Sequence, residues 1–313
     1  MSSADSPQLS RSGQAVIYVA LGLALLLVVG VLVGAKVFFD RAGDRPVSMG
    51  PLPGPMVESE ECRQFIEGLP DELLGHDRAE IVEPVPAGVA AWNSSSTEEV
   101  TLRCGVDLPF QYTEYSQPVE IDGVEWLQVR DATPDSTLQT WYTVDRSPVV
   151  AVTADAAAMG GADNPVEGLS GVVSALPEED HEPNPAPLSG LAPGDTSVCG
   201  ELMANLPETV AEEYERVGTA DEYTAAWVAQ GLEPVVLRCG VAPPENYEPG
   251  AVLHQVNEIP WFEDTTLANG TTSSTWFALG RATDIAVSVP QATGNAAVVE
   301  LGEAIAAHTP EQG

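Results

Sequence analysis

An internal repeat is the feature that most constrains this chain. Leu102-Arg103-Cys104-Gly105-Val106 recurs 135 positions later as Leu237-Arg238-Cys239-Gly240-Val241, and upstream, at a displacement of 137, Cys62 matches Cys199. All six Trp and all four Cys of the chain fall into matched pairs. The period is too long for a solenoid, whose repeats have roughly 20–50 residues. The sequence therefore predicts a tandem duplication of one globular domain.

The repeat also divides the chain into segments. The stretch at 177–195 has many Pro, Glu and Asp residues and no aromatic residue, which is typical of a solvated, fairly stiff linker. We predict a short tail at 1–14, a transmembrane anchor at 15–39, a Pro/Gly-rich stalk at 40–57, a first repeat domain at 58–176, an acidic linker at 177–195, a second repeat domain at 196–309 and a tail at 310–313.

The N-terminal segment from Ala15 to Ala35 contains no charged residue and no Pro. As a helix it would span roughly 30 Å, the thickness of the hydrocarbon core of a bilayer. Val33-Gly34-Ala35 also fits a signal-peptidase site, but the apolar stretch exceeds the usual h-region of roughly 7–15 residues. We therefore favour a plasma-membrane anchor over a cleaved signal peptide.

Charge distribution bears on partners and on orientation. The chain has 12 Lys+Arg against 47 Asp+Glu, for a net charge of −35. Nucleic acid is excluded as a partner, because binding it requires clustered cations. Arg11 precedes the apolar segment, whereas Lys36, Arg41 and Arg45 follow it. A positive-inside count would therefore keep the large C-terminal part in the cytoplasm, but the cysteines favour an extracytoplasmic location.

Each copy places one cysteine on a predicted helix and one on a predicted strand. Cys62, Phe65, Ile66 and Leu69 follow a helical spacing, as do Cys199, Leu202, Met203 and Leu206, with Ser59 and Ser197 as candidate N-caps. Cys104 and Cys239 lie on the apolar face of alternating strands. We predict the disulfides Cys62–Cys104 and Cys199–Cys239. Buried free thiols and a four-cysteine zinc site are the alternatives, although no close Cys pair of the kind that zinc sites use is present.

The remaining pattern of each copy indicates β-structure. A hairpin is predicted at 119–129 around Asp122-Gly123, further strands at 138–144, 149–153, 274–279 and 285–289, and closing helices at 169–176 and 296–307. The predicted fold class is α+β: an N-terminal transmembrane helix, then two homologous domains. Each domain has an antiparallel sheet of three or four strands, flanking helices and one helix-to-strand disulfide.

The pattern Cys…Leu-Pro…Ala-Ala-Trp…Leu-Arg-Cys-Gly-Val…Trp…Arg, placed behind an N-terminal membrane segment, resembles the actinobacterial domain of unknown function 3515. The resemblance covers most of each repeat. It implies a secreted or membrane-anchored envelope protein, and it implies no activity or catalytic residues. Two copies in one chain depart from the usual single copy.

Arg and Trp are the candidate ligand contacts. Arg103, Arg238, Arg146 and Arg281 form matched pairs that would suit an anionic group, or alternatively structural ion pairs and stacking on Trp. Most of the paired Trp residues are expected in the core. Trp141 and Trp276 alternate with polar or small neighbours and are expected to face outward as the contact site.

The sequence contains no metalloprotease, nucleophile-elbow or nucleotide-binding motif, and we predict no metal site and no cofactor. The hypothesis is a non-catalytic binding or scaffolding module of the cell envelope, whose partner is an envelope protein or a cell-wall component. The alternative is an envelope-polymer hydrolase with Asp/Glu acid–base chemistry.

Overall fold

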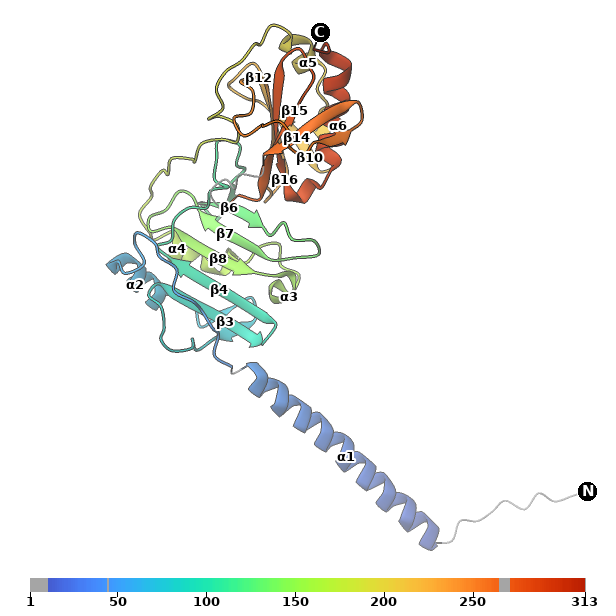
Figure 1. Ribbon diagram of the computed structural model, residues 1–313. Helices are drawn as coiled ribbons and strands as arrows, with labels where there is room; N and C mark the ends of the chain where they lie inside the picture. Colours follow the sequence, from blue (N-terminus) through green and yellow to red (C-terminus); the bar gives the residue numbers. More distant parts are fainter. Residues whose placement is uncertain (1–10, 44, 265–270, 313) are drawn as a thin grey trace, which may run out of the picture.

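The computed structural model describes residues 11–43, 45–264 and 271–312. A long helix, α1 (Arg11–Gly43), projects away from two domains, and the C-terminus lies in the second of them (Figure 1). The stretch Val16–Ala35 is long and apolar enough to cross a membrane, and none of it is buried in the structure. The chain thus carries an N-terminal apolar helix that could be a membrane anchor or a signal sequence. Residues 1–10 of the predicted N-terminal tail, and residue 313 of the C-terminal one, lie outside the described residues.

The first domain is built on one antiparallel sheet of eight strands, in the order β1-β2-β3-β4-β8-β7-β6-β5. The strands are β1 (Glu72–Leu73), β2 (His76–Arg78), β3 (Val89–Ser95), β4 (Glu98–Cys104), β5 (Val119–Ile121), β6 (Val124–Arg130), β7 (Gln139–Thr143) and β8 (Val150–Ala154). The predicted hairpin is confirmed, because Ile121 pairs with Val124 across Asp122-Gly123, both of which have positive φ.

The second domain repeats this topology, with the order β13-β14-β15-β16-β12-β11-β10-β9. Its strands are β9 (Thr209–Val210), β10 (Tyr214–Val217), β11 (Thr224–Val228), β12 (Val235–Val241), β13 (His254–Val256), β14 (Ile259–Asp264), β15 (Ser273–Ala278) and β16 (Asp284–Pro290). The α+β class and the duplication are therefore confirmed, but each sheet has eight strands instead of the predicted three or four.

A disulfide joins helix to sheet in each domain, as predicted. Cys62 of α2 (Glu60–Glu67) is bonded to Cys104 of β4, and Cys199 of α5 (Cys199–Ala204) to Cys239 of β12. Ser59 caps α2 by accepting a hydrogen bond from the backbone N–H of Cys62. The prediction for Ser197 is wrong, because α5 begins after Val198 without a side-chain cap.

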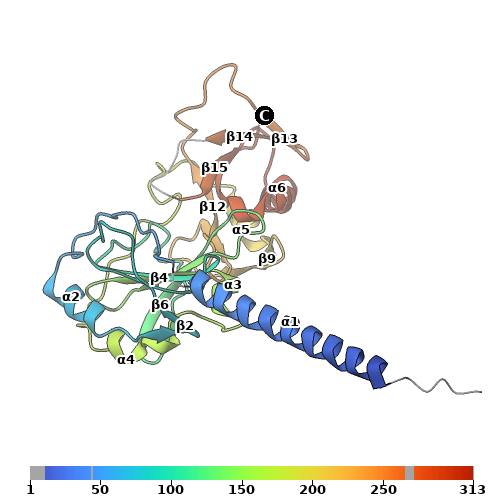
Figure 2. The ribbon, with the colours of Figure 1, turned by 90° about the horizontal axis from the view of Figure 1, so that it is seen from below.

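Further helices follow the last strand of each sheet. In the first domain these are α3 (Ala156–Met159), the 3-10 turn η1 (Glu167–Leu169) and α4 (Ser170–Val173); in the second they are the turn η2 (Gln291–Thr293) and α6 (Ala296–His308). Figure 2 shows α2 and α4 close together beside the first sheet, and both contribute residues to its main core. The second core has the same plan, with α5 and α6 packed against the sheet.

The opposite face of each sheet is covered by the segment that precedes the domain. Val47 and Met49 pack against Val89 and Ala91, and the backbone N–H of Val47 bonds to the carbonyl of Glu80 at 2.8 Å. We call residues 47–57 the first strap. The equivalent second strap, residues 186–196, packs Ala186 and Leu188 onto β11 and β12. The first strap lies within the predicted stalk, and the second, except for residue 196, lies within the predicted linker. Apolar contacts therefore hold part of each predicted segment against its domain.

Candidate functional site

The Leu-Arg-Cys-Gly-Val motif of each copy is the place where the strap crosses the sheet. Its arginine bonds to strap carbonyls: an Arg103 Nη donates to Gly50 at 3.0 Å, and an Arg238 Nη to Leu188 and Leu191 at 3.0 and 2.9 Å. Its glycine lies so close to the strap that a Cβ on Gly105 would be 2.3 Å from the backbone of Met56. The motif therefore fastens strap, sheet and disulfide at one point.

The other matched arginines also make structural contacts. Arg146 is buried and donates hydrogen bonds to the Asp145 carboxylate at 2.7 Å and to the Gly123 carbonyl at 2.7 Å. Arg281 donates to the Thr309 hydroxyl at 2.9 Å and to the Ala306 carbonyl at 3.2 Å, at the C-terminal end of α6. These interactions agree with the structural alternative, and the four arginines form no common site.

Two tryptophans have the same hydrogen bond in both copies. The indole N–H of Trp92 donates to the Pro70 carbonyl, and that of Trp227 to the Pro207 carbonyl, each at 2.9 Å. Arg78 and Arg216 lie over these rings, 4.9 and 5.9 Å from their centroids. This third pair of matched arginines was missed by the sequence analysis, although its displacement of 138 lies close to the other two.

The outer tryptophans differ between the copies. Trp141 is only 5% exposed and belongs to the core, so the prediction that it faces outward is wrong. The reason is a hydrogen-bonded cover, in which Gln139 accepts from the Trp141 indole at 2.9 Å and donates to the sulfur of Met159 at 3.0 Å. Trp276 is half-buried and lines an open groove with Glu263, Ser274 and Asn295.

The two domains dock through unlike surfaces. The end of β6 in the first domain meets the β11–β12 turn in the second, where the backbone N–H of Arg130 donates to the Gly231 carbonyl at 2.7 Å. Gly231 has a φ of 74°, and a Cβ there would lie 2.8 Å from Cγ of Arg130, so the backbone conformation and the close approach both favour glycine. Tyr115 of the first domain packs into the apolar cluster under the second strap. The duplicated domains thus form one unit with a cleft between them.

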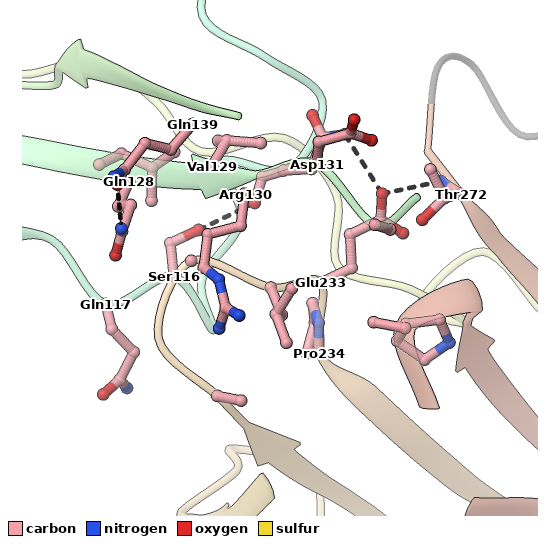
Figure 3. Close-up of a pocket in the computed structure, with 18 of the residues that line it drawn as sticks. Ser116, Gln117, Gln128, Val129, Arg130, Asp131, Gln139, Glu233, Pro234 and Thr272 are labelled. Carbon is pink, nitrogen blue, oxygen red and sulfur yellow. Dashed lines mark hydrogen bonds between the residues drawn. The ribbon is translucent and has the colours of Figure 1, made fainter. Parts of the chain in front are cut away.

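The interdomain cleft has a volume of about 230 Å³, and Figure 3 shows residues of both domains around it. Among the described residues, its walls carry one arginine, Arg130, two acids, Asp131 and Glu233, and several side-chain amides. The amides belong to Gln111, Gln117, Gln128 and Gln139. Amides both donate and accept hydrogen bonds, so the cleft suits an uncharged polar ligand better than an ion.

Glu233 is the buried acid of this cleft. It is 9% exposed and lines both the cleft and a neighbouring cavity of about 330 Å³ under the second strap. Its carboxylate accepts hydrogen bonds from the backbone N–H of Thr272 at 2.7 Å, from Gln111 of the first domain at 3.2 Å and from the hydroxyl of Ser273. Figure 3 shows Glu233 directed toward Thr272. Glu233 therefore links the first domain to the start of β15.

A buried tyrosine lies near the cleft. The Tyr214 hydroxyl is buried and has no hydrogen-bond partner among the described residues. Burial, with smaller contributions from the charges of Glu213 and Glu233, raises the pKa of Tyr214 well above its usual value, and Arg130 opposes this only in part. The phenol therefore remains neutral across the physiological pH range.

The family follows from the two copies. Residues 21–181 and 178–313 each match the family model described as a protein of unknown function (DUF3515). The chain belongs to the DUF3515 family. Neither the curated proteins nor the solved structures that were searched contain a match. The two matches meet near residue 180, so each DUF3515 unit includes the segment that precedes its domain.

In the first DUF3515 unit a serine, a histidine and a glutamate lie together, which are the residue types of a catalytic triad. Ser94 lies 3.0 Å from Nδ1 of His76 and donates a hydrogen bond to Glu98 at 2.7 Å, and this bond and one from Ser95 lower the pKa of Glu98. In a catalytic triad the acid orients the histidine, but here Nε2 of His76 faces the Ala158 carbonyl at 2.6 Å. The second unit has Tyr214 and Ala229 at the positions of His76 and Ser94. Among the described residues, no group of three or more His, Cys, Asp or Glu is placed to hold a metal.

Proposed function

We propose that this DUF3515 protein is a membrane-anchored, extracytoplasmic module that binds or scaffolds a component of the cell envelope without catalysis. The observation that carries the proposal is the interdomain cleft, where Glu233 and several amides converge from both copies. A duplication whose halves are docked around a polar cleft is expected of a binding protein, because ligand pockets form preferentially between domains.

The location is supported by two features of different origin. The apolar stretch Val16–Ala35 has the length of a transmembrane helix. Both disulfides are fully buried in the domain cores, and such bonds persist in oxidising compartments. The sign of the flanking charges opposes this orientation, so the topology needs a direct test.

Reporter cysteines on either side of α1 provide that test. The four native cysteines are bonded and should not react, so a membrane-impermeant maleimide should label only a reporter on the outer side. Val252, which is 75% exposed, is the outer site, and Ser3 is the inner one. We expect V252C to be labelled in intact cells and S3C only after lysis.

The reverse labelling pattern would contradict the proposed orientation and would place both domains in the cytoplasm. Release of the wild-type protein into the medium, without its apolar helix, would show that this helix is a cleaved signal sequence and not an anchor. Wild-type protein, with its bonded cysteines, is the background control.

A sedimentation assay with purified cell walls distinguishes the binding proposal from the hydrolase alternative. The full chain in detergent should co-sediment with the walls and release no soluble fragments. We expect G231A to weaken binding about tenfold, because its Cβ would collide with Arg130 and open the cleft. G280A is the matched control, since Gly280 has the same φ of 74° and nothing within 4 Å of its Cβ position.

Two outcomes would overturn this proposal. Release of soluble fragments, abolished by E233Q or E98Q, would favour the hydrolase alternative. Equal binding by wild type, G231A and G280A would show that the interdomain cleft is not the binding site.

A further inference from the structure

The second domain has a groove beside Trp276, whose counterpart in the first domain, Trp141, is buried. Trp276 lies in its wall and is half-buried. Its ring forms a T-shaped pair with Trp261 at a centroid distance of 6.4 Å, and the ring of His254 lies 5.1 Å from it. The groove has a volume of about 580 Å³, and Thr272 and Pro290 belong both to its wall and to that of the interdomain cleft. The two cavities are therefore neighbours.

Comparison of the copies shows why the groove is open. In the first domain, residues 155–166 between β8 and η1 include α3, and Met159 of that helix completes the cover over Trp141. In the second domain only residues 291–295 join β16 to α6, and η2 is their only helical turn. The same tryptophan position is thus closed in one copy and accessible in the other, although the topology is identical.

The polar groups around Trp276 indicate the chemistry of a ligand. The hydroxyls of Thr272 and Ser274 and the amides of Gln291 and Asn295 line the groove, together with the carboxylate of Glu263. The Ser274 hydroxyl accepts a hydrogen bond from the Trp276 indole at 2.9 Å and keeps its own proton for a ligand. The Asn295 side chain makes no capping bond to α6. Hydroxyls and amides around one aromatic face match the needs of a sugar ring, which presents C–H groups on its faces and hydroxyls at its edge.

The charge of the domains further restricts the class of ligand. From Pro46 onward the chain has eight Arg, no Lys and 44 Asp/Glu, and this field repels anionic polymers. Among the described residues that line the groove, Glu263 is the only acid, and its Oε2 lies 3.7 Å from Nε2 of His254. A site for a cation would concentrate carboxylates around the aromatic ring, whereas this groove presents hydroxyls and amides.

We propose that the groove binds one uncharged sugar ring of a polysaccharide chain, stacked on Trp276 and held at its edge by Asn295 and the Ser274 hydroxyl of β15. This inference rests on the proposed extracytoplasmic location, because that is where such polymers occur. It does not depend on binding in the interdomain cleft.

The test is calorimetric titration of the full chain, in a detergent without a sugar headgroup, with tetrasaccharides of glucose, mannose, galactose and N-acetylglucosamine. At least one of them should bind with a Kd of about 1 mM or better. W276A should weaken that binding about tenfold or more, and N295A by a smaller factor. Y247A is the matched control, because Tyr247 is a 43% exposed aromatic residue of the same domain outside the groove.

Thermal denaturation checks that W276A folds. If W276A does not fold, N295A still tests the proposal, because Asn295 is exposed and its replacement changes no buried side chain. The proposal is overturned if no tetrasaccharide binds, if tetralysine alone binds, or if W276A and N295A bind like Y247A. The maleimide experiment measures the location of the domains independently of sugar binding. If V252C is labelled in intact cells but no sugar binds, the sugar-binding proposal is refuted and the extracytoplasmic location still stands.

Discussion

Replacing Cys62 and Cys104 together by alanine is expected to lower the free energy of unfolding of the first domain by about 4 kcal/mol. The bond closes a loop with a sequence separation of 42, and its removal frees the unfolded chain from that constraint. Both cysteines are fully buried between α2 and β4, so the alanines also lose packing. Urea unfolding of the full chain, followed by the fluorescence of its tryptophans, measures the change.

The matched double variant of Cys199 and Cys239 is the control for domain assignment. Its loop has a separation of 40, so the chain-entropy model predicts an equal loss, but in the transition of the second domain. Limited proteolysis identifies which domain opens first in each variant. A loss below about 1 kcal/mol in both variants would show that packing, and not the cross-link, keeps these helices on their sheets.

Periodicity explains which parts of the fold the sequence could predict. Strands such as β4 and β7 alternate buried and accessible side chains, and both were found. In β11 all five residues are buried, because the core covers one face and the second strap the other, so no alternation marks it. The two-residue strands β1 and β9 are too short for any periodic signal.

Composition was misleading where a few apolar residues determine the packing. The segment at 177–195 is acidic and rich in Pro, yet Ala186 and Leu188 are buried and Arg238 holds the carbonyl of Leu188. The same limit applies to the site. The interdomain cleft combines Gln111 with Glu233, residues of different copies, and no spacing within one repeat reveals such a pair.

The divergence of the copies follows from their docking. Glu98 occupies in the first copy the position of Glu233, but it is accessible at the β3–β4 turn and bonds only to Ser94 and Ser95 among the described residues. Gly231, which lies close to the Arg130 side chain, has Ser96 as its counterpart. Equivalent turns of the two copies thus differ: the β11–β12 turn lies at the interdomain interface, and the β3–β4 turn is accessible.

Replacing Gly105 by alanine is expected to destabilise the first domain by about 3 kcal/mol or more. Gly105 has a φ of 80°, and its Cβ would lie 2.3 to 2.5 Å from backbone atoms of Met56 and Val57, which cannot move without detaching the strap. G75A is the matched control: Gly75 has a φ of 81° but nothing within 4 Å, so it isolates a conformational cost of about 1–2 kcal/mol.

The second copy offers an internal comparison for this prediction. At Gly240 the nearest atom to a Cβ is the side-chain methyl of Thr196, at 2.5 Å, and the closest backbone atom, the Asp195 carbonyl oxygen, is 3.0 Å away. Rotation of the Thr196 side chain about χ1 would move this methyl and relieve part of the collision. G240A should therefore lower the free energy of unfolding by less than G105A and by more than G75A. Equal losses in the three variants, measured by urea unfolding, would mean that the positive φ alone demands glycine in the Leu-Arg-Cys-Gly-Val motif. A larger loss in G105A would instead show that contact with the first strap adds to the requirement for glycine at Gly105.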